Sequence, residues 1–209
     1  MFPLGVLKKN FKKVLNLQFN GSIADSTLRH ASYGATNVAN ISGELVTTAS
    51  TGTIKYGNVL DDFSLKGDVI ITSRFKLPPA SLSGKYLFTF SSADNVVRSD
   101  AFAAYFTNEE TPRLAFTLGY PVTGVTALIV PAANYTPIGN TYLDLVFKKQ
   151  GDTISIYING QTTPVATKTQ ANIQTMNIST ANAHVLQLFG ELTYLNDGVC
   201  DFLTIERFL

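Results

Sequence analysis

The chain has 209 residues, of which 45% are hydrophobic and 11% aromatic, while only 15% are charged. This composition excludes a disordered chain and favours a single well-packed domain, since all-β sandwiches of this length often form one domain. With 16 basic and 15 acidic residues the net charge is +1, so no overall field attracts nucleic acid or an anionic membrane surface. One cysteine excludes an internal disulfide, and two distant histidines do not make a zinc site.

Residues 1–13 differ from the rest of the chain because apolar residues alternate with four lysines. Pro3 and Gly5 interrupt the apolar start, and the lysines follow it, which is the reverse of a secretory signal peptide. No apolar run reaches the roughly 18 residues of a membrane span, so we expect cytoplasmic synthesis without a signal peptide and no membrane insertion. The segment is predicted to be an arm, either frayed, packed on its own domain or docked on a partner protein. The expected docking residues are Phe2, Leu4, Leu7, Lys8, Lys9, Phe11, Lys12 and Lys13.

Alternation of apolar and polar residues predicts strands along the rest of the chain, and residues 33–40 are predicted to be a loop. Glycine, proline, asparagine and serine interrupt the pattern about every eight to twelve residues, which is the spacing of a sandwich or barrel. No segment shows a helical period with caps. The predicted strands cover residues 14–19, 41–48, 52–56, 68–77, 86–90, 102–106, 114–118, 141–148, 153–158, 185–189 and 199–208.

Residues 141–161 contain the clearest hairpin. Leu143, Leu145 and Phe147 share one predicted face, and Ile154, Ile156 and Ile158 share one in the partner strand. Residues 149–152 supply a polar connection that contains glycine. The Asn159-Gly160 pair predicts a type I′ turn, because both residues tolerate positive φ.

Five stretches, in this order, resemble the laminin G-like branch of the concanavalin A-like lectin/glucanase superfamily: LQFNGSIADST, DDFSLKGDVIITSRFKLP, KYLFTFSSADN, NTYLDLVFKKQGDTISIYINGQ and FGELTYLNDGVCDFLTIERFL. The resemblance covers residues 14–209. It implies a two-sheet antiparallel jelly-roll sandwich in which the opening strand pairs beside the closing strand. The closing strand retains Asp201, whereas Cys200 replaces an acidic residue and Tyr142 replaces a frequent tryptophan. We therefore expect an all-β jelly-roll sandwich preceded by an extended N-terminal arm.

Enzymatic activity is not expected. The glucanases of this superfamily place paired carboxylates on one strand face, because glycoside hydrolysis needs two such groups beside one bond. No strand here carries that pattern, and the adjacent pairs Glu109-Glu110 and Asp61-Asp62 are predicted to lie in solvated turns. The sequence also lacks a G-x-S-x-G elbow, a P-loop and a G-x-G-x-x-G turn after a strand.

Carbohydrate binding is one expected role, since sugars stack on exposed aromatic rings and bond to polar side chains. For any single tyrosine the simpler interpretation is a ring that covers the sheet and a hydroxyl in water. The candidates on polar strand faces are Arg74, Lys76, Tyr105, Arg113, Tyr142, Asp144 and Tyr157, and the candidates near turns are Tyr120, Tyr135 and Tyr194.

Calcium is the only cofactor that the resemblance admits, because relatives often bind Ca²⁺ in loops. Asp94-Asn95 and Asn196-Asp197 offer hard oxygen ligands. Two residues do not supply the six to eight oxygens of a calcium site, so ordinary turns are the competing interpretation.

Two functions are compatible at different ends of such a molecule. The chain resembles small virion proteins of bacteriophages, which implies a decoration, tail or host-contact protein anchored by its arm to other virion proteins. Lysis would then release it without secretion. The alternative is a free carbohydrate-binding lectin-like protein, calcium-dependent or not, whose partners are cell-surface glycans. Homo-oligomerisation is compatible with both.

Overall fold

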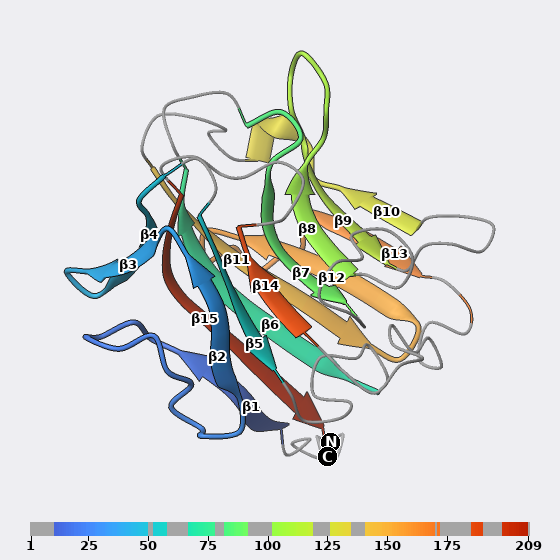
Figure 1. The fold of residues 1–209 in the computed structure, drawn as a ribbon. Coiled ribbons are helices and arrows are strands. Elements are labelled where there is room, and N and C mark those ends of the chain that lie inside the picture. Colours follow the sequence, from blue (N-terminus) through green and yellow to red (C-terminus); the bar gives the residue numbers. More distant parts are fainter. Residues whose placement is uncertain are drawn as a thin grey trace.

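The computed structural model contains two antiparallel β-sheets that stack face to face (Figure 1). The structure describes residues 11–49, 52–57, 67–77, 82–91, 102–118, 126–134, 141–169, 171, 185–189 and 198–208. Within these residues the only helical element is the 3₁₀ helix η1 (Ala132–Asn134), and no helix is long and apolar enough to cross a membrane. The predicted all-β jelly-roll sandwich is confirmed.

The larger sheet has eight strands in the order β13-β12-β11-β6-β15-β4-β3, with β1 paired to β15. Its strands are β1 (Phe11–Leu17), β3 (Val38–Ile41), β4 (Glu44–Thr47), β6 (Val69–Lys76), β11 (Tyr142–Gln150), β12 (Thr153–Ile158), β13 (Ala166–Thr169) and β15 (Val199–Phe208). The pairing of β1 with β15 confirms that the opening strand lies beside the closing strand (Figure 1).

The smaller sheet has seven strands in the order β10-β9-β8-β7-β14-β5-β2. They are β2 (Ala31–Thr36), β5 (Thr53–Gly57), β7 (Tyr86–Ser91), β8 (Phe102–Phe106), β9 (Leu114–Leu118), β10 (Thr126–Ile129) and β14 (Val185–Leu188). The edge strands β10 and β13 contact each other, so the two sheets meet along one side of the sandwich.

The core lies between the sheets and is rich in phenylalanine. The Phe102 ring on β8 lies 5.4 Å from Phe90 in its own sheet and 4.6 Å from Phe147 in the facing sheet. Each fully buried phenylalanine contributes roughly 1.5–3 kcal/mol through removal of its surface from water. The alternation predicted for β6, β11 and β12 is confirmed, because every second residue of these strands is buried.

A buried carboxylate holds the first loop against β1. Asp25 accepts hydrogen bonds from the backbone amides of Asn16, Thr27, Arg29 and His30, at 2.9–3.3 Å, and from the Thr27 hydroxyl at 2.6 Å. The Ser26 amide donates in turn to the Asn16 carbonyl at 3.0 Å. These bonds cover part of the free edge of β1, which would otherwise expose unpaired backbone groups.

The predicted start of the first strand is wrong. The first strand begins at Phe11 and not at residue 14, because Phe11, Lys12 and Lys13 pair with the last residues of β15. The Phe11 ring also meets Phe208 edge-on at 6.2 Å. Phe11, Lys12 and Lys13 therefore belong to the sandwich, while residues 1–10 of the predicted arm lie outside the described residues.

The predicted loop at residues 33–40 is instead formed by β2 and β3. These strands lie at the edges of the smaller and the larger sheet, and Asn37 joins them with a φ of 48°. Alternation reflects a buried face, and none of the described side chains of β2 and β3 is buried, so these strands show no regular apolar alternation. The short strands β10 and β13, also at sheet edges, were likewise not predicted.

Two side chains are placed differently from the prediction. Tyr86 is half-buried and not in the core, because a register shift between Tyr86 and Phe88 leaves Leu87 and Phe88 both buried. Lys149 belongs to β11 rather than to the connection, which is reduced to Gly151 and Asp152. Its side chain is fully buried, and Nζ donates to the Gly67 carbonyl at 2.5 Å.

Candidate functional site

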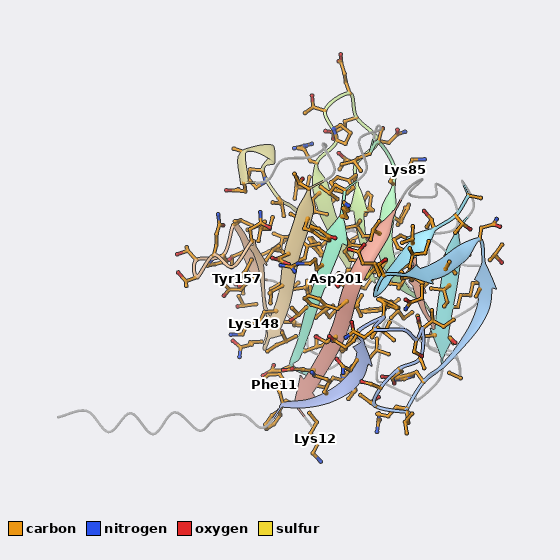
Figure 2. All side chains as sticks on the ribbon, turned by 90° about the vertical axis from the view of Figure 1, so that its left-hand side faces the viewer. Phe11, Lys12, Lys85, Lys148, Tyr157 and Asp201 are labelled. Atoms are coloured by element: carbon orange, nitrogen blue, oxygen red, sulfur yellow. The ribbon has the colours of Figure 1, made fainter. Side chains whose placement is uncertain are left out.

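Six charged or aromatic side chains gather on the outer face of the larger sheet; one of them, Asp201, is labelled in Figure 2. They come from β4, β6, β11 and β15, which lie together in the sheet. The strand register brings them together, because Arg74 pairs with Asp144 and Lys76 pairs with Tyr142. We call this set the Arg74 cluster; its members are Glu44, Arg74, Lys76, Tyr142, Asp144 and Asp201.

Arg74 is the centre of the cluster. Its Nε lies 2.6 Å from Asp144 Oδ1 and its Nη2 lies 3.1 Å from Oδ2, which makes a two-pronged ion pair. Its Nη1 lies 3.5 Å from Asp201 Oδ2. Because β6 runs between β11 and β15, the guanidinium lies between the two carboxylates. Asp144 first, and Asp201 second, raise the pKa of Arg74 above its ordinary value.

The cluster remains open to solvent. The side chains of Arg74, Asp144 and Asp201 are 40%, 37% and 32% exposed. The Asp201 position is set by a register shift of β15 between Cys200 and Phe202, which lets Asp201 reach Arg74. In Figure 2 Asp201 lies well above Phe11 and Lys12, which mark the lower end of the sandwich.

Tyr142 supplies the aromatic surface of the cluster and is 43% exposed. Arg74 Cζ and Lys76 Nζ each lie 5.5 Å from the ring centroid, so cation–π attraction orients the ring. The Tyr142 hydroxyl donates a hydrogen bond to the Glu44 carboxylate. This bond, with partial burial, raises the pKa of Tyr142 to about 12.

The turn after β12 is hydrogen-bonded to the cluster. The Asp144 amide donates to Asn159 Oδ1 at 3.1 Å, and the Asn159 amide donates to the Asp144 carbonyl at 3.0 Å. Asn159 and Gly160 have φ values of 50° and 72°, which confirms the predicted turn. A polar depression of about 700 Å³ begins there; its described lining is Asn134, Gly160, Gln161, Thr162, Thr163, Pro164 and Val165.

The smaller sheet carries two other predicted residues, Tyr105 and Arg113. The rings of Tyr105 and Tyr86 stack with centroids 5.1 Å apart. Arg113 forms a two-pronged ion pair with Glu109, at 3.0 Å and 2.7 Å, which lowers the pKa of Glu109. Burial first, and the neighbouring Tyr86 and Glu109 next, raise the pKa of Tyr105.

The predicted sugar-binding residues thus fall into two groups on different sheets. Arg74 and Tyr142 meet on β6 and β11, whereas Tyr105 and Arg113 lie at β8 and β9. Glu109 and Glu110 are exposed in the bend between β8 and β9, as predicted for a solvated turn. The predicted residues outside the described ranges are Phe2, Leu4, Leu7, Lys8, Lys9, Asp61, Asp62, Asp94, Asn95, Tyr120, Tyr135, Tyr194, Asn196 and Asp197.

Two members of the cluster, Glu44 and Asp201, were not among the predicted sugar-binding candidates. Lys76 and Asp144 were among them, because they share the outward parity of Arg74 and Tyr142. Asp201 and Glu44 come from strands far away in the sequence, and only the sheet order brings them near. Among the described residues, no group of three or more His, Cys, Asp or Glu side chains could hold a metal ion.

The sheet order and this solvent-exposed face define the chain as a jelly-roll β-sandwich with a polar surface cluster. No protein-family model and no curated protein matches the sequence. Similar solved structures include domain 4 of AbnA, a GH43 extracellular arabinanase from Geobacillus stearothermophilus, in complex with arabinotriose. Its TM-score is 0.62 at 16% identity, over 94% of this chain and 93% of that chain.

Two further similar structures come from other kinds of protein. The CBM2 module of the evolved Dit of Lactobacillus casei BL23 phage J-1 has a TM-score of 0.59 at 11% identity, over 96% of this chain and 97% of that chain. The binding domain of botulinum neurotoxin serotype D has a TM-score of 0.66 at 12% identity, and the match covers 92% of this chain but 47% of that one. At these identities the similarity shows the fold alone.

Proposed function

We propose that this chain is a non-catalytic glycan-binding module and that the Arg74 cluster is its binding site. The observation that carries the proposal is the exposed Tyr142 ring beside two carboxylates held by Arg74. Carboxylate oxygens accept hydrogen bonds from sugar hydroxyls, and an aromatic ring offers an apolar surface to a sugar face. The AbnA domain, solved with arabinotriose, supports a carbohydrate as ligand.

The arrangement of the cluster argues against catalysis. A glycosidase holds its two carboxyl groups on opposite sides of the scissile bond. Here the Arg74 guanidinium occupies the space between Asp144 and Asp201, where that bond would have to lie. A similar fold also occurs in a conserved carbohydrate esterase of bacteriophage phi24B, so hydrolysis of glycan esters is an outcome that the experiments should measure.

We further propose that the module belongs to a phage virion, as a decoration, tail or host-contact protein of the laminin G-like type. Two of the similar structures are phage proteins, the CBM2 module of phage J-1 and the phi24B esterase. In this proposal residues 1–10 dock on another virion protein, while the sandwich exposes its outer face to host glycans. A free lectin, with or without calcium, is the alternative.

A glycan array tests the binding site. We expect the full chain to bind a subset of glycans. Tyr142→Ala and Asp144→Asn should each weaken that binding at least tenfold, since a hydrogen bond to a charged group contributes roughly 1.5–3 kcal/mol. Glu110→Gln, which removes an exposed carboxylate elsewhere, is the matched control. A blank array, with calcium and with chelator, overturns the glycan proposal, and release of product from esterified glycans overturns the non-catalytic one.

The virion proposal needs a separate experiment. Mass spectrometry of purified particles should detect the chain, and deletion of residues 1–10 should prevent its incorporation. The deletion stops before Phe11 so that the pairing of β1 with β15 is retained. Normal incorporation of the shortened chain overturns the docking role of the arm, and absence of the chain from particles overturns the virion assignment.

A further inference from the structure

The polar depression beyond the Asn159-Gly160 turn adjoins the Arg74 cluster. Two hydrogen bonds join Asn159 to the backbone of Asp144, and the next residue, Gly160, lines the depression. Tyr157, two residues before the turn, marks this side of the sheet in Figure 2. One backbone turn therefore belongs to both surfaces, which places them side by side.

The chemistry of the depression differs from that of the cluster. Its described lining residues carry amide, hydroxyl and small apolar groups and no ionisable side chain. Gln161, Thr162 and Thr163 are exposed, and a Cβ built on Gly160 would meet no atom within 4 Å. Amides and hydroxyls both donate and accept hydrogen bonds, as sugar hydroxyls do, whereas the described part of the lining offers a charged ligand no counter-charge.

The volume of the depression and the segments that line it fit a ligand longer than one sugar. Its volume of about 700 Å³ lies within the roughly 300–1,000 Å³ of small-molecule sites. One wall is η1, whose Asn134 amide donates to the Pro131 carbonyl at 3.0 Å. Another part of the lining is the connection to β13, whose Val165 amide donates to the Ile156 carbonyl at 2.8 Å. η1 follows β10 and this connection precedes β13, and these two edge strands contact each other.

We propose that the depression is a second subsite, which binds the uncharged units of an oligosaccharide whose first unit lies at the Arg74 cluster. This inference rests on the proposed function, because the cluster must bind the first sugar. It adds that the ligand is an uncharged, linear chain of several sugars. Affinity should then rise with chain length until the depression is filled.

Titration of the full chain with neutral oligosaccharides of one to six residues, built from arabinose, glucose, galactose or mannose, tests the subsite. We expect the best series to bind at least tenfold more tightly as it lengthens, and its longer members to shift the backbone NMR signals of Gly160, Gln161 and Thr162. Gln161→Ala combined with Thr162→Ala should abolish that gain and leave the shortest ligands unaffected. Thr167→Ala, an exposed threonine of β13 outside the depression, is the control and should bind like the unmodified chain.

The possible failures are distinguishable. Binding that shifts the signals of Arg74 and Asp144 but not those of residues 160–163, with no dependence on length, overturns the subsite and leaves the proposed function intact. Length-dependent binding that survives the Gln161 and Thr162 substitutions also overturns the subsite. No binding by any member of the four series contradicts both proposals.

Discussion

The Arg74 guanidinium and the Asp144 carboxylate are joined by two hydrogen bonds, 2.6 Å and 3.1 Å long, across the paired strands β6 and β11. Both side chains are more than one third exposed, so water screens their attraction. An exposed pair of this kind contributes roughly 0.2–1 kcal/mol to stability. Its main effect is therefore to position the carboxylates on the outer face.

We accordingly expect Arg74→Lys to separate stability from binding. Lysine keeps the positive charge but has no planar fork that could hold Asp144 and Asp201 together. Urea unfolding should show a loss of less than about 1 kcal/mol, whereas glycan affinity should fall about as far as in Asp144→Asn. If Arg74→Lys bound glycans normally, the guanidinium would have no positioning role.

Tyr142 should make stability depend on pH at alkaline values. Its pKa is raised from the ordinary 10.0 to about 12, so the folded chain holds the phenolic proton more tightly than the unfolded chain. The resulting stabilisation is complete below pH 10 and disappears as the pH rises toward 12. Between pH 10 and pH 12, the free energy of unfolding measured with urea should therefore fall less for Tyr142→Phe than for the unmodified chain. Tyr157→Phe, on the same face, serves as the control, and identical curves for Tyr142→Phe and the unmodified chain would refute the Glu44 hydrogen bond.

Lys149 should act in the opposite sense. Burial first, and Arg207 next, lower its pKa from the ordinary 10.5, against the opposing effects of Asp68 and Asp152. The unfolded chain then binds more protons than the folded chain between the lowered pKa and 10.5, so this lysine makes stability rise with pH in that window. Lys149→Met should remove the rise, whereas Lys148→Met, whose side chain points to the outer face, should retain it. Equal pH slopes in the two variants would contradict the burial of Lys149.

Asp25 should be the most costly single position in the first loop. Asp25→Ala removes five hydrogen bonds at once, although the Thr27 hydroxyl keeps the Val14 carbonyl and the Arg29 amide keeps Thr27 Oγ1 as acceptors. A buried donor that loses its acceptor costs roughly 1–3 kcal/mol. We expect a loss of about 3 kcal/mol in the free energy of unfolding. Ser22→Ala removes one exposed local bond and should cost about 0.5 kcal/mol or less. A loss below 1 kcal/mol for Asp25→Ala would show that the loop is held by other contacts.

Much of the architecture could be predicted from local patterns. The alternation in β6, β11 and β12 determines which side chains face the core, because successive residues of a strand point to opposite sides. The Asn159-Gly160 pair determines its turn, since few other residues tolerate two successive positive φ angles. The edge strands β2 and β3 escaped prediction because none of their described side chains is buried, so they carry no alternating apolar face.

The sequence by itself therefore determined the all-β class, the core faces and the outward positions of Arg74 and Tyr142. Tertiary structure alone decided which strands are neighbours, and so brought Asp144 and Asp201, 70 and 127 positions from Arg74, to the same guanidinium. It also decided that Lys149 is buried, because a lysine can lie inside only where an acceptor such as the Gly67 carbonyl meets its ammonium group. The physical reason is the distance along the sequence over which each interaction acts. Turn formation and alternation depend on residues close in sequence, whereas ion pairs and buried charges depend on groups that only the folded sheet order brings together.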